Sequence, residues 1–282
     1  MKKLLSLILV LTMVFALAAC GGAKEEKAET AEKTPVNVFA AASLSAVMAD
    51  FEASYEMANP NIDIVVNADS SGTLLTQIQE GAPCDIFFSA AQKQVKALEE
   101  GGQLIDGTKK NVLNNRLVVV TRKDSNTAVT GLADIAKASS IALADGSVPA
   151  GKYTRTAMIA LGLIAEAEDP AAITTQEISD QLGGVEISEQ GNVSKVLAAV
   201  AEASCEVGTT YLSDTVGHED DIKVLEIVGN DLTGDIIYPA ARVINPDATD
   251  AITAAADDFF AYITNDAAAE LYTKYGFDIF KG

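Results

Sequence analysis

The sequence predicts an α/β fold built on mostly parallel β-strands. From Val36 onwards, short apolar runs of strand length alternate with segments in which apolar residues recur three and four positions apart. Such an alternation of strand and helix patterns is typical of α/β domains with parallel strands. Small polar turns containing Ser, Gly and Asp join several of these strands to the helices that follow them. The 282 residues are enough for one large domain or two medium ones.

The first nineteen residues have the composition of a signal peptide. Lys2 and Lys3 precede an apolar run from Leu4 to Ala19, which matches the basic and apolar regions of such peptides. The run ends in LAAC, whose last residue is Cys20, and this resembles the lipobox of bacterial lipoproteins, in which the cysteine is lipidated. A transmembrane anchor is the alternative, but a membrane span needs about 20 apolar residues and this run is shorter. We therefore predict a signal peptide over residues 1–19 and a lipid on Cys20 that anchors the protein to the extracytoplasmic side of the cell membrane.

The segment after Cys20 is predicted to be a tether. Residues 23–35 contain no aromatic and no large aliphatic side chain. A segment that cannot bury apolar surface stays disordered. We expect residues 20–35 to be a disordered tether that carries the lipid; a solvated helix is the alternative and leaves the function unchanged.

Nine segments have the length and composition of β-strands. Most are rich in Val, Ile and Phe and are bounded by Gly, Ser, Asp or Asn. The expected strands are Val36–Ala40, Ile62–Ala68, Asp85–Ser89, Leu117–Thr121, Ser140–Ala144, Glu186–Ile187, Val207–Tyr211, Val224–Ile227 and Ile236–Ile244.

Apolar residues at helical spacing predict amphipathic helices between these strands. Three such helices bury the sets Leu44, Val47, Met48, Phe51 and Tyr55; Leu74, Leu75 and Ile78; and Val193, Val196, Leu197 and Val200. Another helix is expected after residue 151, and a final helix from about Ala248 to Lys274.

Composition excludes several classes of function. The formal net charge of −20 opposes nucleic acid and anionic lipid headgroups as partners, because both require clustered Lys and Arg. His218 is the single histidine, so a His-ligated metal site is not expected and a Ser-His-Asp triad would need His218 as its base. No Gly-x-Ser-x-Gly segment and no Lys-bearing phosphate loop is present. We predict a binding protein without catalytic residues or cofactor; a hydrolase that acts through Ser43, or a phosphoryl-transfer enzyme, is the enzymatic alternative.

Four turns at the starts of predicted helices offer hydrogen-bond donors without a positively charged side chain. They are the turn at Ser43 and the segments at residues 69–72, 145–151 and 190–193. A helix N-terminus has free backbone N–H groups and a partial positive charge. In open α/β sheets such ends gather at the carboxyl edge of the strands. A serine at a helix start is more often a cap than a ligand, so the joint pattern, and no single residue, favours an anion site.

Five segments together resemble the periplasmic molybdate-binding proteins of ABC importers. They are VFAAASL at 38–44, SSGT at 70–73, GAPCDIFFSA at 81–90, VPAG at 148–151 and YGF at 275–277. The resemblance implies a two-lobed type II periplasmic-binding-protein fold, in which each lobe is a mostly parallel sheet flanked by helices and the ligand lies in the interlobe cleft. The chain would cross between lobes near Val120 and Ile237. Lobe 1 would then contain residues 36–120 and 238–282, and lobe 2 residues 121–237.

Carried over by position, the oxyanion contacts of that family fall on five residues of this sequence. They are Ser43 and Ser71 in lobe 1 and Ala150, Val193 and Tyr211 in lobe 2. The resemblance implies hydroxyl and backbone donors from the serines, backbone N–H groups from Ala150 and Val193, and the phenol of Tyr211.

Two residues depart from the family pattern. Asp69 places an acid beside the implied contacts, and Gly72 stands where another small polar residue is expected. The carboxylate of Asp69 must point away from the anion or be paired, since it would otherwise oppose binding.

The chemistry of the implied ligand agrees with a site made only of donors. Molybdate and tungstate are fully ionised tetrahedral dianions near neutral pH, so their oxygens only accept hydrogen bonds. Hydrogen phosphate carries a proton that such a site leaves unpaired. Sulfate differs from molybdate in size alone, so a binding protein for sulfate, thiosulfate or a carboxylate is the main alternative. The metal would enter as an oxyanion, and no direct cation ligands are expected.

The resemblance also implies partners, namely an ABC permease with its ATPase. Because both lobes contribute contacts, ligand binding would favour a closed cleft that the permease senses. A receptor that presents its closed form to a sensor kinase is an alternative. We expect a monomer in which Cys84 and Cys205 lie in different lobes and remain reduced.

Overall fold

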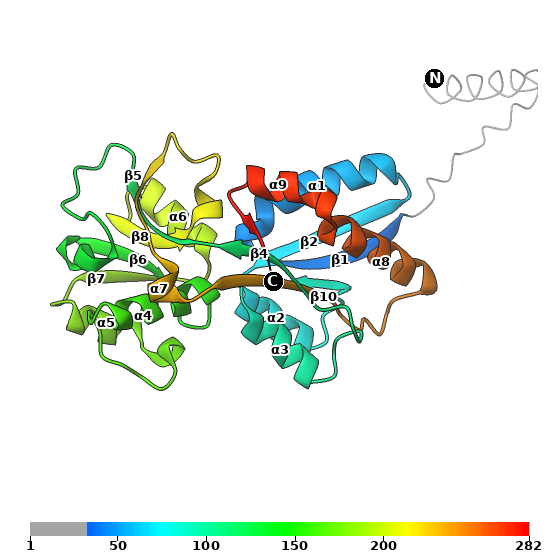
Figure 1. Ribbon diagram of the computed structural model, residues 1–282, viewed down its shortest axis with the longest axis horizontal. Coiled ribbons are helices and arrows are strands. Elements are labelled where there is room, and N and C mark those ends of the chain that lie inside the picture. Colours follow the sequence, from blue (N-terminus) through cyan, green and yellow to red (C-terminus); the bar gives the residue numbers. More distant parts are fainter. Residues whose placement is uncertain (1–32, 282) are drawn as a thin grey trace, which may run out of the picture. The chain divides into compact units, whose positions relative to one another are not determined.

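A computed structural model describes residues 33–281, and their strands form two separate β-sheets (Figure 1). The predicted signal peptide, the proposed lipidation site Cys20 and the predicted tether as far as residue 32 lie outside the described residues. Among the described helices, none combines the length and the apolar character that a membrane crossing requires. We call each sheet, with the helices that cover it, a lobe.

The sheet of the first lobe has six strands in the order β11-β4-β10-β3-β1-β2. Their bounds are β1 Thr34–Ala41, β2 Ile62–Asp69, β3 Ile86–Phe88, β4 Lys110–Asn115, β10 Ile236–Arg242 and β11 Asp278–Ile279. Strand β1 lies between β2 and β3 and is parallel to both. The four consecutive residues from Val38 to Ala41 in β1 are all buried. Because successive side chains of a strand point to opposite faces, such a run indicates that both faces of the strand are covered.

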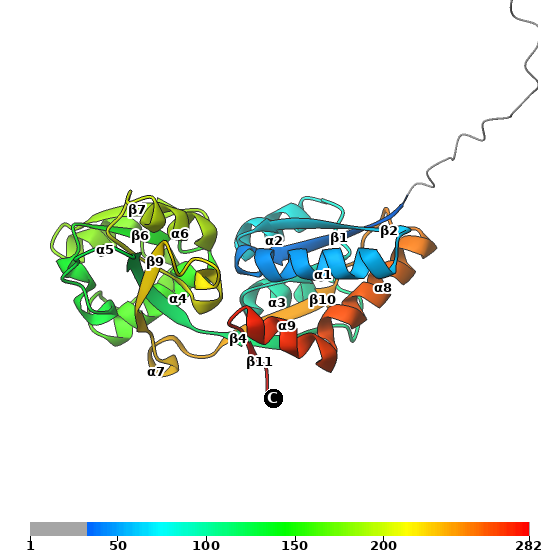
Figure 2. The same ribbon diagram turned by 90° about the horizontal axis from the view of Figure 1, so that it is seen from above.

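Helices cover both faces of this sheet (Figures 1 and 2). The helices α1 Ser45–Ala58, α8 Asp250–Thr264 and α9 Ala269–Lys274 lie on one face, and α2 Ser71–Gln79 and α3 Gln92–Glu100 lie on the other. The predicted apolar face of α1 is confirmed, since Val47, Met48, Phe51 and Tyr55 are all buried. Burial of each such side chain stabilises the fold by about 1.5–3 kcal/mol.

The second lobe is built on a five-stranded sheet in the order β7-β6-β8-β5-β9. Its strands are β5 Leu117–Arg122, β6 Ser140–Ala144, β7 Glu186–Gln190, β8 Val207–Tyr211 and β9 Ile222–Ile227. Its helices are α4 Pro149–Ala160, α5 Thr175–Gln181, α6 Val193–Ala201 and the short α7 Asn230–Thr233. Helices α4 and α5 cover one face and α6 the other (Figure 1). The predicted apolar face of α6 is confirmed, because Val193, Val196, Leu197 and Val200 are buried.

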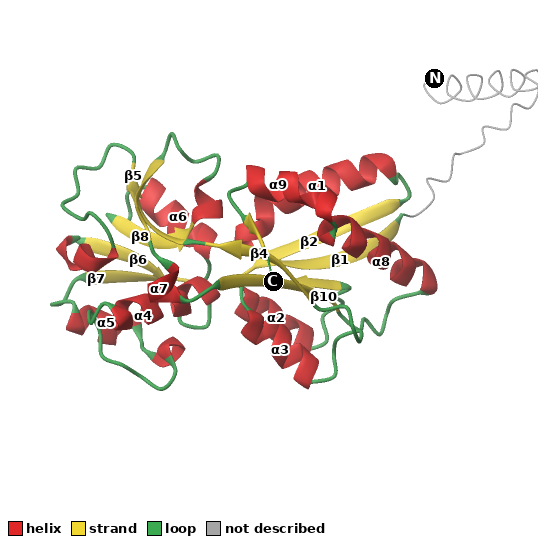
Figure 3. Cartoon of the chain, in the orientation of Figure 1, coloured by secondary structure: helices red, strands yellow, loops and turns green. Residues whose placement is uncertain are grey.

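Two segments join the sheets (Figure 3). Strand β4 ends at Asn115 and β5 begins at Leu117, so the first crossing lies at Arg116. The second crossing lies between α7 and β10, at residues 234–235. Both occur slightly before the expected positions near 120 and 237. The first was misplaced because β4 and β5 form one almost continuous extended stretch with no turn residue between them.

The mostly parallel pairing that was predicted holds only for the three strands at one end of each sheet. Strands β1, β2 and β3 are parallel, as are β6, β7 and β8, whereas β10, β4 and β11 in the first lobe and β5 and β9 in the second pair antiparallel. The double crossing explains the reversed strands β5 and β10. Each enters its lobe from the cleft, where the parallel strands have their carboxyl ends, so it must run against them. Strands β9 and β4 then pair antiparallel with these reversed strands.

Both ends of the described domain differ from the prediction. The tether was expected to reach residue 35, but Thr34 and Pro35 already belong to β1. Thr34 N–H donates to the Asn61 carbonyl at 2.8 Å, and β3 pairs only with the later part of β1, so a proline is tolerated there. The expected final helix is two helices, because Asn265 leaves the helical conformation and its side chain caps the next turn by accepting from Ala268 N–H.

Cys84 and Cys205 are free and buried, as predicted. Cys84 precedes β3 in the first lobe and Cys205 precedes β8 in the second. Burial raises the pKa of both thiols. They therefore behave as small apolar side chains and not as reactive thiolates.

Candidate functional site

A small cavity of about 10 Å³ lies where turns of the two lobes meet. Its lining comes from the starts of four helices, from the ends of β1 and β8, and from the turn after β3. The lining residues are Ala41, Ala42, Ser43, Ser70, Ser71 and Ala90 of the first lobe, and Val148, Pro149, Asn192, Val193 and Tyr211 of the second. The structure thus brings Ser43, Ser71, Val193 and Tyr211 together, and Ala150 directly follows a lining residue. None of the lining side chains carries a charge.

Ser43 lies in a short 3-10 helix, Ala42–Leu44, that joins β1 to α1. It does not cap α1, which begins without a side-chain cap. Its hydroxyl lies 2.9 Å from the hydroxyl of Tyr238, a residue of β10, in a buried contact. The interpretation of Ser43 as a helix cap is therefore wrong, and its hydroxyl belongs to the wall of the cavity.

Ser71 and Ser70 have different roles at the start of α2. Ser70 is the N-cap, and its hydroxyl accepts from Thr73 N–H at 3.1 Å. Ser71 is buried, and its hydroxyl accepts from the Ala90 N–H at 2.9 Å. The Ser71 hydroxyl thus keeps its own proton for another acceptor, which makes it the better candidate contact.

The second lobe presents the N-termini of α4 and α6 to the cavity. Helix α4 has no side-chain cap and begins with Pro149, so the N–H of Ala150 is the first backbone donor of the helix. A Cβ atom on Gly151 would lie 2.0 Å from the Asp145 carbonyl oxygen, so only glycine allows this close approach of helix and loop. In α6, the Asn192 side chain accepts from Lys195 N–H at 3.0 Å, which leaves the Val193 N–H for another partner. Both helix dipoles favour an anion here.

The Tyr211 hydroxyl is the one buried hydroxyl of the cavity wall that lacks a hydrogen-bond partner within residues 33–281. Its ring packs edge-on against that of Tyr238, with centroids 5.8 Å apart. Burial raises its pKa well above the usual value of 10, so the phenol stays protonated and can donate. A buried hydroxyl without a partner costs about 1–3 kcal/mol unless something else accepts from it. The cavity wall therefore contains an unused donor.

The acid beside the site, Asp69, is paired. Its Oδ1 accepts from Ser70 N–H at 2.7 Å and from the Asn192 side-chain amide at 3.0 Å. Asp69 ends β2 in the first lobe, whereas Asn192 precedes α6 in the second. The carboxylate that departs from the family pattern thus binds an amide of the opposite lobe.

Gly72, the other departure, lies at a close approach of the two lobes. A Cβ atom at this position would lie 2.8 Å from the backbone carbonyl oxygen of Ser147, in the loop before α4. Real Cβ atoms do not come this close to an oxygen, so any side chain at position 72 would push the lobes apart. The lack of a side chain at Gly72 therefore has a steric role.

Sequence reasoning missed two residues that support the site, Tyr238 and Arg155. Tyr238 lies in an apolar strand, where an aromatic residue resembles ordinary core. Arg155 is buried and donates to the carbonyl groups of Ala144 at 2.9 Å, Gly151 at 2.9 Å and Ile173 at 2.7 Å, which fixes the start of α4. A buried arginine four residues after a glycine gives no signal in a single sequence.

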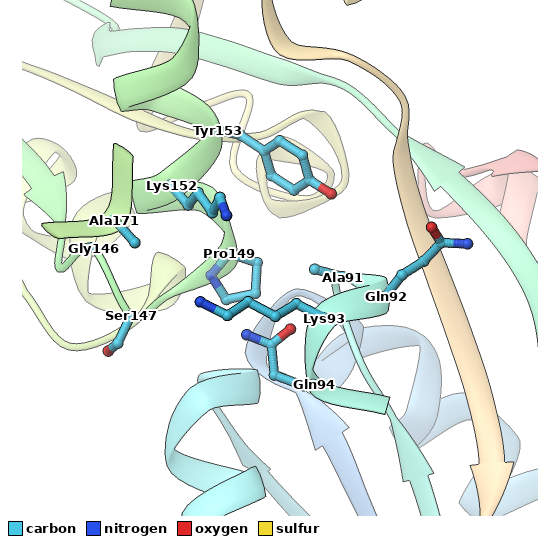
Figure 4. A pocket seen from close by; sticks show the side chains of 10 residues that line it. All are labelled: Ala91, Gln92, Lys93, Gln94, Gly146, Ser147, Pro149, Lys152, Tyr153 and Ala171. Atoms are coloured by element: carbon cyan, nitrogen blue, oxygen red, sulfur yellow. The ribbon is translucent and has the colours of Figure 1, made fainter. Parts of the chain in front are cut away.

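A second, larger cavity of about 160 Å³ adjoins the first, and Pro149 lines both (Figure 4). Lys93 and Gln94 of α3 and Lys152 of α4 point into it. The carboxylate of Asp169 lies 3.4 Å from the Lys93 ammonium and 3.3 Å from that of Lys152, which links the two lobes. Exposed pairs of this kind contribute at most about 1 kcal/mol. The two lysines nevertheless place positive charge beside the uncharged cavity of an otherwise acidic protein.

The geometry does not support the hydrolase alternative. His218 is half exposed, and its Nδ1 lies 3.9 Å from Asp221. Across the described part of the chain no hydrogen bond joins His218 to Ser43, whose hydroxyl contacts Tyr238 instead. The same residues contain no cluster of three or more His, Cys, Asp or Glu that could hold a metal ion.

Comparison with known proteins finds relatives that are named as solute-binding proteins. The sequence matches the bacterial extracellular solute-binding protein family over residues 36–278. It is 31% identical over 256 residues to the molybdate-binding protein ModA of Haemophilus influenzae, with 88% of this chain and 91% of that protein covered. It is 27% identical over 277 residues to YvgL of Bacillus subtilis, named as an ABC transporter substrate-binding lipoprotein, with 98% of both covered. Among solved structures, the periplasmic molybdate-binding protein of Azotobacter vinelandii has the same fold, with a TM-score of 0.71 at 17% identity over 87% of this chain and all of that one.

Proposed function

The chain belongs to the bacterial extracellular solute-binding protein family, and we propose that it captures molybdate or tungstate and delivers it to an ABC importer. Members of this family bind solutes and do not catalyse reactions. The named relatives include the molybdate-binding protein ModA at 31% identity. The proposed contacts are the five predicted ones, Ser43, Ser71, Ala150, Val193 and Tyr211.

The observation that carries this proposal is the polarity of the cavity wall. Its hydroxyls and the N-termini of α4 and α6 offer hydrogen-bond donors, and its side chains include no carboxylate and no cation. The nearby carboxylate of Asp69 is occupied by Ser70 N–H and by Asn192. A tetrahedral dianion that only accepts hydrogen bonds satisfies such donors, including the Tyr211 hydroxyl. Hydrogen phosphate would bring a proton for which the wall has no carboxylate.

The origin of these contacts in two lobes supports a role in transport. The donors of Ser43 and Ser71 belong to the first lobe, and those of Val193 and Tyr211 to the second. One anion satisfies both sets only when the cleft is shut, so binding favours the closed form. A permease that recognises the closed form then receives loaded protein. The partners would be this permease and its ATPase, and the protein itself would be a monomer.

The N-terminal residues and the family support an extracytoplasmic, membrane-anchored location. Family members act outside the cytoplasm, and the relative YvgL is named a lipoprotein. We extend this to a lipid on Cys20 after removal of residues 1–19. Cys20→Ala should leave the protein unprocessed or release it from membranes, whereas Cys84→Ala should have no such effect. Membrane fractionation and the N-terminal mass of both variants test the anchor.

Calorimetric titration of the full-length protein with molybdate, tungstate, sulfate and hydrogen phosphate tests the ligand. We expect tight binding of molybdate or tungstate and little or no binding of hydrogen phosphate. Stronger binding of sulfate than of both metal oxyanions would favour the sulfate alternative. Ser43→Asp puts a carboxylate against the dianion in a poorly screened site and should abolish binding. Undiminished affinity in Ser43→Asp would end the assignment of the site.

A further inference from the structure

A chain of buried hydrogen bonds leads from the first crossing between the lobes to the cavity. Its members are Asn115 at the end of β4, Tyr238 in β10 and Ser43 on the cavity wall. All three side chains are buried. Each of these side chains has a limited number of protons for hydrogen bonding. Once the donor and the acceptor are assigned at Asn115, those of the following bonds can be deduced in turn.

The orientation of the Asn115 side chain is fixed at its carbonyl end. Its Oδ1 accepts from the Arg116 N–H at 2.8 Å, a group that can only donate. The other end must therefore be the amide, whose two protons go to the Ser213 hydroxyl at 2.9 Å and to the Tyr238 hydroxyl at 3.0 Å. An inverted amide would set two donors against each other at Arg116.

The next step follows at Tyr238. Its hydroxyl accepts from Asn115, so its single proton is available for the Ser43 hydroxyl at 2.9 Å. Burial raises the pKa of this phenol well above 10, so the proton is present at any physiological pH. Within residues 33–281 the Tyr238 hydroxyl has no other hydrogen-bond partner, so its proton goes to Ser43, and the proton of Ser43 is free to point elsewhere.

We infer that Asn115 and Tyr238 are positioning residues that make Ser43 a hydrogen-bond donor to the bound oxyanion. The inference rests on the proposed oxyanion-binding function and deepens it. Neither residue needs to touch the ligand: Asn115 orients Tyr238, and Tyr238 occupies an acceptor site of Ser43. A hydroxyl that accepts one hydrogen bond also donates more strongly, because bonds in such a chain polarise one another.

The second serine of the cavity is arranged in the same way by a different donor. The Ser71 hydroxyl accepts from the Ala90 backbone N–H at 2.9 Å, so its proton is also free. Both serines of the first lobe thus receive a hydrogen bond from the protein on one side and keep a proton for the other. This shared arrangement suits an anion that carries no proton of its own.

The test is a double-mutant cycle with molybdate as the titrant and full-length protein in the calorimeter. Ser43→Ala should weaken binding by about tenfold or more, the range for a hydrogen bond to a charged group. Tyr238→Phe should weaken binding by about five- to tenfold, because Ser43 then loses the bond that orients it. In the Ser43→Ala background, Tyr238→Phe should change affinity by less than about twofold, since the residue through which it acts is gone.

Tyr272→Phe provides the matched control. Tyr272 is equally buried in the same lobe, but its hydroxyl donates to the Ile263 carbonyl at 2.8 Å, away from the cavity. This variant should lower the melting temperature and leave the affinity for molybdate unchanged. Both Tyr→Phe variants remove one buried hydroxyl, so a loss of affinity confined to Tyr238→Phe separates positioning from a general loss of packing.

The outcomes distinguish this inference from the proposed function. If the unmodified protein fails to bind molybdate, the proposed function and the inference fall together. If it binds molybdate and Ser43→Ala weakens binding, the function stands, and an unchanged affinity in Tyr238→Phe overturns the inference. A Tyr238→Phe effect of equal size with and without Ser43 would also overturn it, because Tyr238 would then act independently of Ser43.

Discussion

The carboxylate of Asp69 and the side-chain amide of Asn192 form a hydrogen bond of 3.0 Å between the two lobes. Asn192 has a double role, because its Oδ1 caps α6 by accepting from Lys195 N–H while its Nδ2 reaches Asp69. The bond holds the Asp69 carboxylate in a fixed place beside the cavity and directs its negative charge toward a hydrogen-bond donor. It also exists only while the lobes are together, so it adds to the stability of the closed form.

A second carboxylate in place of the Asn192 amide should oppose closure of the lobes. Asn192→Asp keeps a good helix cap but sets two carboxylates about 3 to 4 Å apart, which costs on the order of 1–4 kcal/mol at the effective dielectric of a protein surface. We expect a large loss of molybdate affinity with little change in the stability of the unliganded protein, which can open. Calorimetric titration and thermal unfolding of the same variant measure both quantities.

The rescue variant makes this prediction specific. Asp69→Asn in the Asn192→Asp background restores one amide and one carboxylate with their places exchanged. The double variant should recover most of the affinity that Asn192→Asp loses. Equal affinity in the single and double variants would mean that the pair does not contribute to closure.

Full closure of the lobes should require glycine at position 72. Gly72→Ala places a Cβ atom 2.8 Å from the Ser147 carbonyl oxygen of the other lobe, and relief of such a clash costs on the order of 1–3 kcal/mol. The affinity for molybdate should fall accordingly. Gly191→Ala is the control, because the nearest atom to its added Cβ is the end of the Lys195 side chain at 3.6 Å. Parallel titrations of the two variants check this prediction, and equal affinities would contradict it.

Much of the fold could be predicted because its helices and central strands carry local patterns. Helix α1 buries the residues that its spacing indicated, and β6 and β8 begin and end where their apolar runs do. Strand β4 was missed because it contains only two apolar residues, Val112 and Leu113. Its place in the sheet depends on pairing with β10 and β11, which are distant in the sequence. No local window contains that information.

The candidate site, like the fold, could be predicted only in part. Ser43, Ser71, Val193 and Tyr211 were identified through resemblance to a family, and the fold brings them to one cavity. The partners of these residues could not be foreseen. Tyr238 lies 195 positions from Ser43 in the sequence, and Asn192 lies 123 positions from Asp69. Hydrogen bonds at such separations follow from the tertiary fold alone.

Stability should depend on pH through Asp214. Burial raises the pKa of this carboxyl to about 6, although Thr210 and the Tyr211 N–H donate to it. The pKa of Asp214 is higher in the folded protein than in the unfolded chain, so its protonation favours the folded state. This contribution to the free energy of unfolding is complete below the unfolded pKa near 4 and is lost as the pH rises through 6. The loss amounts to at most about 3 kcal/mol at neutral pH.

Asp214→Asn keeps an acceptor for both donors and removes the charge. We expect the variant to be more stable than the parent at about pH 7.5 and equally stable at about pH 4. The difference between the two unfolding curves isolates Asp214 from the other carboxyls, which titrate equally in both proteins. A constant difference across this range would show that Asp214 does not titrate in it.

Tyr211 allows the sharpest separation of binding from folding, because its hydroxyl is buried and lacks a partner among residues 33–281. Tyr211→Phe removes this unsatisfied group, so the unliganded protein should keep its stability or gain up to about 1 kcal/mol. The same change deletes a proposed donor to the anion and should weaken molybdate binding by about 1.5–3 kcal/mol. An ordinary core tyrosine behaves in the opposite way: Tyr272→Phe breaks a bond to the Ile263 carbonyl and should lower stability while sparing affinity. Thermal unfolding without ligand and calorimetric titration with molybdate give a stability and an affinity for each of the two variants. If Tyr211→Phe destabilises the unliganded protein and leaves affinity intact, Tyr211 is a core residue and the contact proposed for the second lobe is wrong.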